Sequence, residues 1–300
     1  MKLISTTVLL LMLSFFSIKA QMPIIVTEDS LKIGNNLFPG ILVIIPEVEY
    51  AITVSNWIKL LESGSRSKVV TENGEMTIFG ARLKDLTDYP QINVYSTLLD
   101  KDSLLYLGVV FELKKDQYIE RSTGEPDLAR TKNFLFSFAK KQYIELAEGQ
   151  LKVEEKKLKV LEKELGSLER DETGMKKSGS SYEKYLTAEK ENLTSLNNDL
   201  ISLSASIEQH RGDLARMTTG TEKDEKVAYI KDLDKQKKKT LKSVTKTENR
   251  ISKYQKEIAK IKTSIPKNDV SQGKSQDQIN AQEAIVQKFT DKLNMIKEFR

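Results

Sequence analysis

The stretch "LTSLNNDLISLSASIEQHRGDLARM" (193–217) carries the pattern that decides how most of this chain folds. Its apolar side chains recur at alternating spacings of three and four residues, so they share one side of a helix. They are Leu193, Leu196, Leu200, Leu203, Ile207, Leu214 and Met217. Because polar residues fill the positions between them, the stretch predicts a helix that supercoils against a neighbour.

Similar apolar frames extend over residues 121–300, and three segments with glycine or proline interrupt them: "DETGMKKSGSS", "TTGTE" and "PKNDVSQGKSQ". Short connections that contain glycine favour antiparallel neighbours. We therefore predict a helical coiled-coil domain over 121–300 that folds up-down-up-down. Its four helices are expected at about 127–170, 181–217, 222–265 and 276–299. Parallel pairing between copies of the chain uses the same heptads and remains the alternative.

His210 is the only histidine, and it falls in this frame where a core side chain belongs. A polar residue at such a position usually sets register or partner choice at some loss of stability. A metal site would need further ligands, and the sequence offers only scattered carboxylates nearby. We therefore interpret His210 as a structural residue of the helical seam. A pH sensor is the alternative, because an imidazole titrates near neutrality.

The preceding residues, 21–120, predict a small α/β head domain. The run "GILVIIPE" (40–47) is typical of a buried strand, and "YAITVSNWIKLLES" (50–63) has its apolar residues on one helical face. Asn73-Gly74 is a strong hairpin signal, and "INVYSTLL" (92–99) and "LLYLGVVFEL" (104–113) read as two strands around a polar turn. We predict one strand, one helix and four further strands in the head.

The predicted fold class is therefore α+β: a small antiparallel-rich β-sheet head with one packed helix, followed by a long antiparallel helical bundle or coiled coil.

The first twenty residues, "MKLISTTVLLLMLSFFSIKA", have the features of a secretory signal peptide: Lys2, an apolar run and a small residue at the end. An uncleaved anchor is the alternative, but the run is shorter than the roughly 20 residues of a membrane span. The chain has no cysteine, which excludes disulfides, thiol nucleophiles and a lipid-modified cysteine. These features together predict bacterial export, to the periplasm or the cell surface.

Motifs for catalysis are weak throughout. Ser65 and Lys68 match the Ser-x-x-Lys motif of penicillin-recognising enzymes, but the Ser-Asp-Asn and Lys-Thr-Gly elements that accompany it are absent. Asp100 and Asp102 fit a hairpin turn better than a calcium loop. No glycine-rich phosphate loop precedes a helix. We expect no catalytic, cofactor-binding or metal-binding residues, no cofactor and no enzymatic activity.

The segment 235–262 is strongly basic, with eleven Lys and Arg against two Glu. A basic helix binds phosphates on nucleic acid, lipopolysaccharide or an anionic membrane. The segment lacks exposed aromatic residues for base stacking, which speaks against nucleic acid. A candidate contact with an anionic surface is assigned to Lys235, Lys237, Lys238, Lys239, Lys242 and Lys246. A solvated face that balances the Glu-rich first helix is the alternative.

Four aromatic residues cluster where the head meets the first long helix: Phe134, Phe136, Phe138 and Tyr143. We expect some of them to dock the head onto the base of that helix.

The layout resembles that of a set of exported bacterial proteins of no assigned activity. The resemblance rests on the "LFPGILVIIPE" strand (37–47) and on the amphipathic helix with Trp57 that follows it, ahead of a Glu/Lys-rich coiled coil. It implies a signal peptide, a small α/β head and a coiled-coil body. It implies neither an activity nor functional residues.

The function predicted from the sequence is that of a non-enzymatic cell-envelope protein. Its head would recognise another envelope protein or a surface polymer, and its helical body would serve as spacer, oligomerisation element or docking face. A periplasmic chaperone or adaptor with helical arms is the first alternative, and an enzyme with its site in the head is the second. Homo-oligomers and peripheral contact with an anionic membrane fit this prediction, and nucleic acid does not.

Overall fold

The computed structural model describes residues 23–102 and 104–299, so the predicted signal peptide, residues 1–20, lies outside the described residues. The chain forms two compact units, Met1–Lys157 with Gln282–Arg300, and Leu158–Ala281. Helices α3 (Glu125–Arg216) and α4 (Thr221–Glu298) contribute to both units. The elements before α3 make up the head, and their bounds are β1 (Ile25–Ile33), β2 (Asn36–Pro46), α2 (Tyr50–Glu62), β3 (Val70–Glu72), β4 (Glu75–Ala81), β5 (Ile92–Lys101), β6 (Leu104–Lys114), β7 (Gln117–Tyr118) and the short 3₁₀ helix η1 (Arg121–Thr123).

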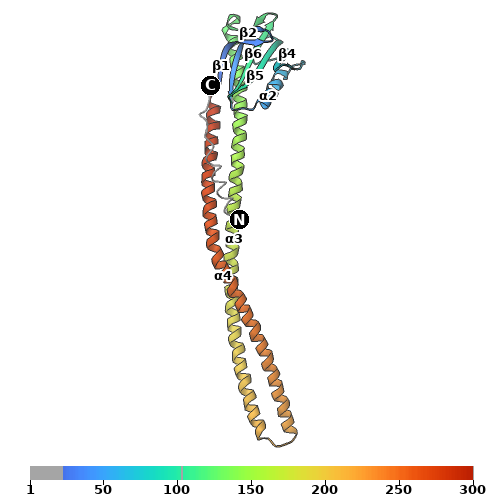
Figure 1. The fold of residues 1–300 in the computed structure, drawn as a ribbon, viewed down its shortest axis with the longest axis vertical. Helices are drawn as coiled ribbons and strands as arrows, with labels where there is room; N and C mark the ends of the chain where they lie inside the picture. Colours follow the sequence, from blue (N-terminus) through green and yellow to red (C-terminus); the bar gives the residue numbers. More distant parts are fainter. Residues whose placement is uncertain (1–22, 103, 300) are drawn as a thin grey trace. The chain divides into compact units, whose positions relative to one another are not determined.

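The strands of the head join in one seven-stranded antiparallel sheet (Figure 1). Their order is β1-β2-β6-β5-β4-β3, and β7 pairs with the end of β6. The predicted Asn73-Gly74 hairpin is confirmed, because both residues have positive φ, 51° and 82°, as a two-residue turn between β3 and β4 requires. The antiparallel sheet followed by long packed helices confirms the predicted α+β class.

Side chains that alternate along the strands bury one face of the sheet as the core. Trp57 of α2 is fully buried against this face, and its Nε1 donates a hydrogen bond of 2.9 Å to Ser96 Oγ of β5. The first turns of α3 add Leu135 and Phe138 to the same core. The head is therefore covered by two helices, where the sequence predicted one.

The order of elements predicted from the sequence lacks two strands, β1 and β7. β1 is an edge strand whose side chains are mostly exposed, so "IVTEDSLKI" lacks the alternation that predicts a half-buried strand. Leu31 of this strand nevertheless packs against Gly40 of β2. A Cβ added at Gly40 would lie only 2.5 Å from Cδ1 of Leu31. β7 has two residues, too few for any pattern.

The prediction of four helices at 127–170, 181–217, 222–265 and 276–299 is wrong. The structure has two long helices, α3 and α4, and only the "TTGTE" segment (218–222) contains a turn between them. The helices run antiparallel beside each other in both units (Figure 1), as shown by Gln282 bonded to Glu154 in the first and Arg250 to Glu189 in the second. Folding back within the chain is thus correct, but as one hairpin.

The two other predicted breaks stay helical, and they lie partly opposite each other across the hairpin. Gln272 Nε2 donates to Glu172 Oε2 at 2.8 Å, and a Cβ at Gly179 would lie 3.5 Å from Ile261. Glu172 of the first segment thus meets Gln272 of the second, whereas Gly179 faces Ile261, which precedes the second segment. An isolated glycine costs a helix only about 1 kcal/mol relative to alanine, and Pro266 removes one backbone hydrogen bond from α4.

Within the described ranges, no helix combines the length and the apolar content needed to cross a bilayer.

Candidate functional site

The face of the sheet opposite the core is open to solvent. Residues that alternate with the core positions point to it, among them Phe79 of β4, Tyr95 of β5 and Glu112 of β6. Phe79 is 57% exposed, and it lies beyond the reach of the short strand β3, which pairs with β4 only up to Thr77. Phe79 is therefore accessible from this face of the sheet.

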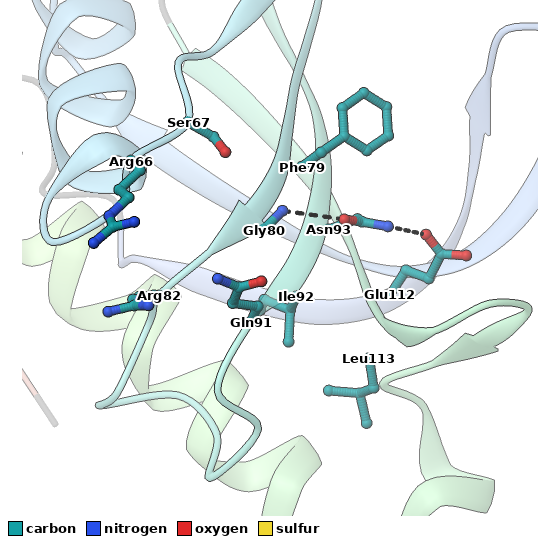
Figure 2. A pocket seen from close by; sticks show the side chains of 10 residues that line it. All are labelled: Arg66, Ser67, Phe79, Gly80, Arg82, Gln91, Ile92, Asn93, Glu112 and Leu113. Carbon is teal, nitrogen blue, oxygen red and sulfur yellow. Dashed lines mark hydrogen bonds between the residues drawn. The ribbon is translucent and has the colours of Figure 1, made fainter.

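Two adjoining hollows lie on this face, and Phe79 borders both. The first, of about 430 Å³, is lined mainly by polar side chains, including Arg66, Arg82, Gln91, Asn93 and Glu112 (Figure 2). The second, of about 460 Å³, is lined by the aromatic residues Phe38, Phe79, Tyr95 and Tyr118 and by the turn at Gly34. We call the two hollows together the open-face groove. Their volumes lie in the range of small-molecule and side-chain binding sites.

A β-bulge shapes the first hollow. The pairing of β4 with β5 shifts register between Ile78 and Ala81, and Gly80 has a φ of 75° that other residues rarely adopt. The Gly80 amide donates to the side-chain oxygen of Asn93 at 3.2 Å in place of a ladder partner. Bulges of this kind re-aim the side chains around them and are frequent beside binding sites.

Glu112 is the electrostatic centre of the groove. It is only 8% exposed and accepts hydrogen bonds from Asn93 Nδ2 at 2.8 Å, Tyr95 Oη at 3.0 Å and the Asp116 amide at 3.2 Å. Burial disfavours the charged carboxylate, but the hydrogen bonds outweigh it and lower the pKa of Glu112. Burial, with the hydrogen bond to Glu112 and its charge, raises the pKa of Tyr95 to about 12.

These shifts limit what the groove can do chemically. Glu112 stays charged and Tyr95 stays neutral at neutral pH, so neither group is suited to transfer protons there. Both instead hold fixed hydrogen-bonding positions. The groove therefore presents a carboxylate at Glu112 and aromatic side chains around it.

The rim of the first hollow is positive. Figure 2 shows Arg66, Arg82 and Gln91 on one side of it. Both arginine side chains are exposed, and neither forms an ion pair with a described residue. Their guanidinium groups have ten N–H donors between them by their chemistry, about five each, which suits carboxylate or phosphate oxygens.

The residues of the two weak catalytic and calcium motifs have structural partners in the head. Ser65 Oγ donates to the Leu61 carbonyl at 3.2 Å and accepts from the Arg82 amide at 2.9 Å, while Lys68 Nζ pairs with Glu62 at 2.7 Å. Asp102, with a φ of 55°, lies in the turn between β5 and β6.

The four aromatic residues predicted to dock the head all lie at the base of α3. Phe138 and Phe134 contact Trp57 edge-on, at ring-centroid distances of 5.0 and 6.4 Å, and Phe136 packs against the same core. Tyr143 is fully buried in a second cluster with Leu293 and Ile296 of α4, and its Oη donates to Glu47 Oε1 at 3.2 Å.

The six lysines predicted to contact an anionic surface lie on α4, in the second unit. Five of them are exposed: Lys235, Lys238, Lys239, Lys242 and Lys246. Lys237 is half-buried, because it occupies a position that faces α3. The structure thus brings five of the six to one side of the helix.

His210 is half-buried, as Leu196 and Leu203 of the same frame are, with 23% of its side chain exposed. Its ring packs edge-on against Tyr229 of α4 at 5.0 Å, and its Nδ1 lies 3.7 Å from Asp213. Among the residues that the structure describes, no group of three or more acidic or histidine side chains is placed to hold a metal ion.

Sequence reasoning missed the open-face groove. Two signals for it were present: Glu112 is the one charged residue between Leu104 and Leu113, and Gly80 interrupts a strand-like run. A glycine inside a strand often marks a bulge. Arg66 and Arg82 carry no such signal, because the loop geometry alone places them beside the sheet.

No family model matches this chain, and no curated protein matches it. A crystal structure of the Smc head domain with a coiled coil and joint, derived from Pyrococcus yayanosii, is similar at 12% sequence identity with a TM-score of 0.24. The similarity covers 82% of this chain and 61% of that one, so this chain spans less than two thirds of its length. Likeness at this level supports no conclusion about function.

Proposed function

We propose that this protein is an exported, non-enzymatic binding and scaffold protein of the cell envelope. The open-face groove of the head recognises another envelope protein or a surface polymer, and the hairpin of α3 and α4 serves as spacer or second docking element. Export rests on the signal-peptide features of residues 1–20 and on the absence of cysteine from the sequence.

The observation that carries the proposal is the combination of groups in the groove. An exposed aromatic residue, Phe79, stands between a polar hollow and one with aromatic side chains, and the lowered pKa of Glu112 keeps its carboxylate charged at neutral pH. Aromatic and arginine side chains dominate the energetics of protein recognition sites. Aromatic walls with amide and carboxylate groups also suit the rings and hydroxyls of a sugar polymer.

Photo-crosslinking in intact cells tests this proposal. A photoreactive residue replaces Phe79 in the full chain, and a matched control replaces Leu99, which is 64% exposed and lines neither hollow. We expect a discrete adduct from position 79 and none from position 99. Protease or glycan-degrading enzymes applied to the adduct then distinguish a protein partner from a polymer.

A second substitution, Arg82→Glu, is expected to reduce the adduct several-fold, because it reverses one of the two positive groups at the rim. Equal adducts from positions 79 and 99, or an adduct that Arg82→Glu leaves unchanged, would show that the groove is not the recognition surface.

A further inference from the structure

The outward side of α4 carries a row of lysines that extends beyond the predicted patch. We call it the lysine face, and it consists of Lys235, Lys238, Lys239, Lys242, Lys246, Lys253 and Lys256. All seven side chains are exposed, and none of their ammonium groups forms an ion pair or a hydrogen bond with a described residue. Their ammonium groups therefore face solvent.

The heptad repeat explains why they share one side. Ile230, Leu233 and Thr247 are buried and recur at the spacings of seam positions that face α3. Lysines of the face lie at the remaining, outward positions of the same repeat. From Lys235 to Lys256 the row runs along roughly 30 Å of helix at 1.5 Å per residue.

The facing helix does not neutralise this charge. Asn192 contacts Thr247 at 3.2 Å, and Glu189 pairs with Arg250, so residues 183–204 of α3 lie opposite residues 235–256 of α4. That part of α3 has four acidic residues, Glu183, Glu189, Glu191 and Asp199, and none of them forms an ion pair with a lysine of the face. The nearest acid on α4, Asp234, pairs with Arg211 at 3.2 Å.

The composition of the lysine face indicates what it binds. It has no arginine, and the nearby Arg250 is held by Glu189 at 3.1 Å. Lysine is a hydrated point charge that suits diffuse attraction, whereas arginine suits bidentate recognition of single groups. The face also has no aromatic side chain on which bases could stack. A straight, purely cationic row matches a flat array of anionic headgroups.

We propose that the lysine face docks the helical hairpin peripherally on an anionic lipid surface. The choice of lipid rests on the export that we propose, because an exported chain comes into contact with the anionic headgroups of membranes. The docking goes beyond the proposed recognition by the head, because it uses other residues in the other unit.

The test measures binding of the full chain to sedimented vesicles of phosphatidylcholine with about one third phosphatidylglycerol, an anionic fraction that mimics a charged leaflet. The variant changes five lysines of the face to glutamine: Lys235, Lys238, Lys239, Lys242 and Lys246. Its matched control changes five exposed lysines of α3 that are interspersed with acids: Lys159, Lys163, Lys177, Lys184 and Lys190. Both variants lose the same charge, and glutamine is as good a helix former as lysine.

We expect the α4 variant to bind at least about tenfold more weakly and the α3 control to bind within about twofold of the parent, since each lysine near the surface contributes to attraction. Binding of the unmodified chain should also weaken steeply as salt is raised above about 0.1 M, where the screening length is about 10 Å. This salt series tests the proposal even if a variant fails to keep its helical circular dichroism.

Three outcomes would overturn the proposal: no binding of the unmodified chain to the anionic vesicles at low salt, an equal loss in both variants, or tighter binding to duplex DNA than to the vesicles at the same salt. The first two would leave the open-face groove untouched, so they are distinguishable from failure of the proposed function.

Discussion

Glu112 is the residue at which charge, burial and the candidate site meet. Its pKa is lowered in the folded head, so its hydrogen bonds contribute stability that is present above its usual value of 4.5 and is lost as pH falls through the lowered value. We expect Glu112→Gln to destabilise the head by about 1–3 kcal/mol at neutral pH, because donors from Asn93 and Tyr95 lose a charged acceptor.

The measurement is denaturant unfolding followed by the fluorescence of Trp57, which is the only tryptophan and lies in the head core. The difference between Glu112→Gln and the unmodified chain should shrink as pH falls below the lowered pKa. The exposed Glu72 serves as the control, and Glu72→Gln should change little at any pH. A difference that stays constant with pH would contradict the assigned network.

At the scale of elements, α3 and α4 run through segments that the sequence marked as breaks. Gly174 and Gly273 lie within these segments, and a Cβ added at either would meet nothing within 4 Å. Because both positions are helical, Gly174→Ala and Gly273→Ala should each stabilise the chain by up to about 1 kcal/mol. The readout is thermal unfolding followed by helical circular dichroism.

Gly40 provides the matching control for this pair. A Cβ there would clash with Leu31 and with the Val109 carbonyl, at 2.5 and 2.8 Å, so Gly40→Ala should lower stability. Loss of stability in the two helical variants, instead of gain, would indicate that α3 and α4 are interrupted where the sequence predicts.

At the scale of the whole molecule, the end of α4 returns to the head across 245 residues of sequence. Lys292 is 8% exposed at its side chain and pairs with Glu47 of the head at 2.5 Å, above the ring of Tyr143. Lys140 Nζ donates to the carbonyls of Lys297 and Phe299, both at 2.7 Å. The first unit is thus held together by contacts of the end of α4 with the head and with the base of α3.

Glu47→Gln should destabilise the first unit by about 2–3 kcal/mol, because it replaces the charged acceptor of the buried Lys292 ammonium by a neutral amide. Hydrogen exchange should rise around Tyr143 and Ile296 and stay unchanged at 200–235 in the second unit. The control is Glu148→Gln, whose pair with Lys297 at 3.3 Å is about half exposed, and we expect less than about 1 kcal/mol from it. Equal acceleration in both units would contradict this assignment.

The candidate site shows where sequence reasoning stops. Alternation along 104–113 places Glu112 on the face opposite the core, yet it says nothing of Asn93, Tyr95 and the Asp116 amide that converge on it. Those groups come together through strand register and a bulge, which depend on pairing between distant segments. Arg66 and Arg82 reach the rim for the same reason.

Local pattern by itself determined the α+β class, the Asn73-Gly74 turn, the helix with Trp57 and the commitment of residues beyond 124 to paired helices. These features follow from the spacing of apolar side chains and from turn chemistry, which act over a few residues. Only the tertiary structure decided that α3 and α4 continue through glycines and Pro266, because the two helices pair along this stretch, as the hydrogen bond between Gln272 and Glu172 shows. The open-face groove also follows only from the tertiary structure, because the register of the paired strands brings together residues that lie far apart in the chain.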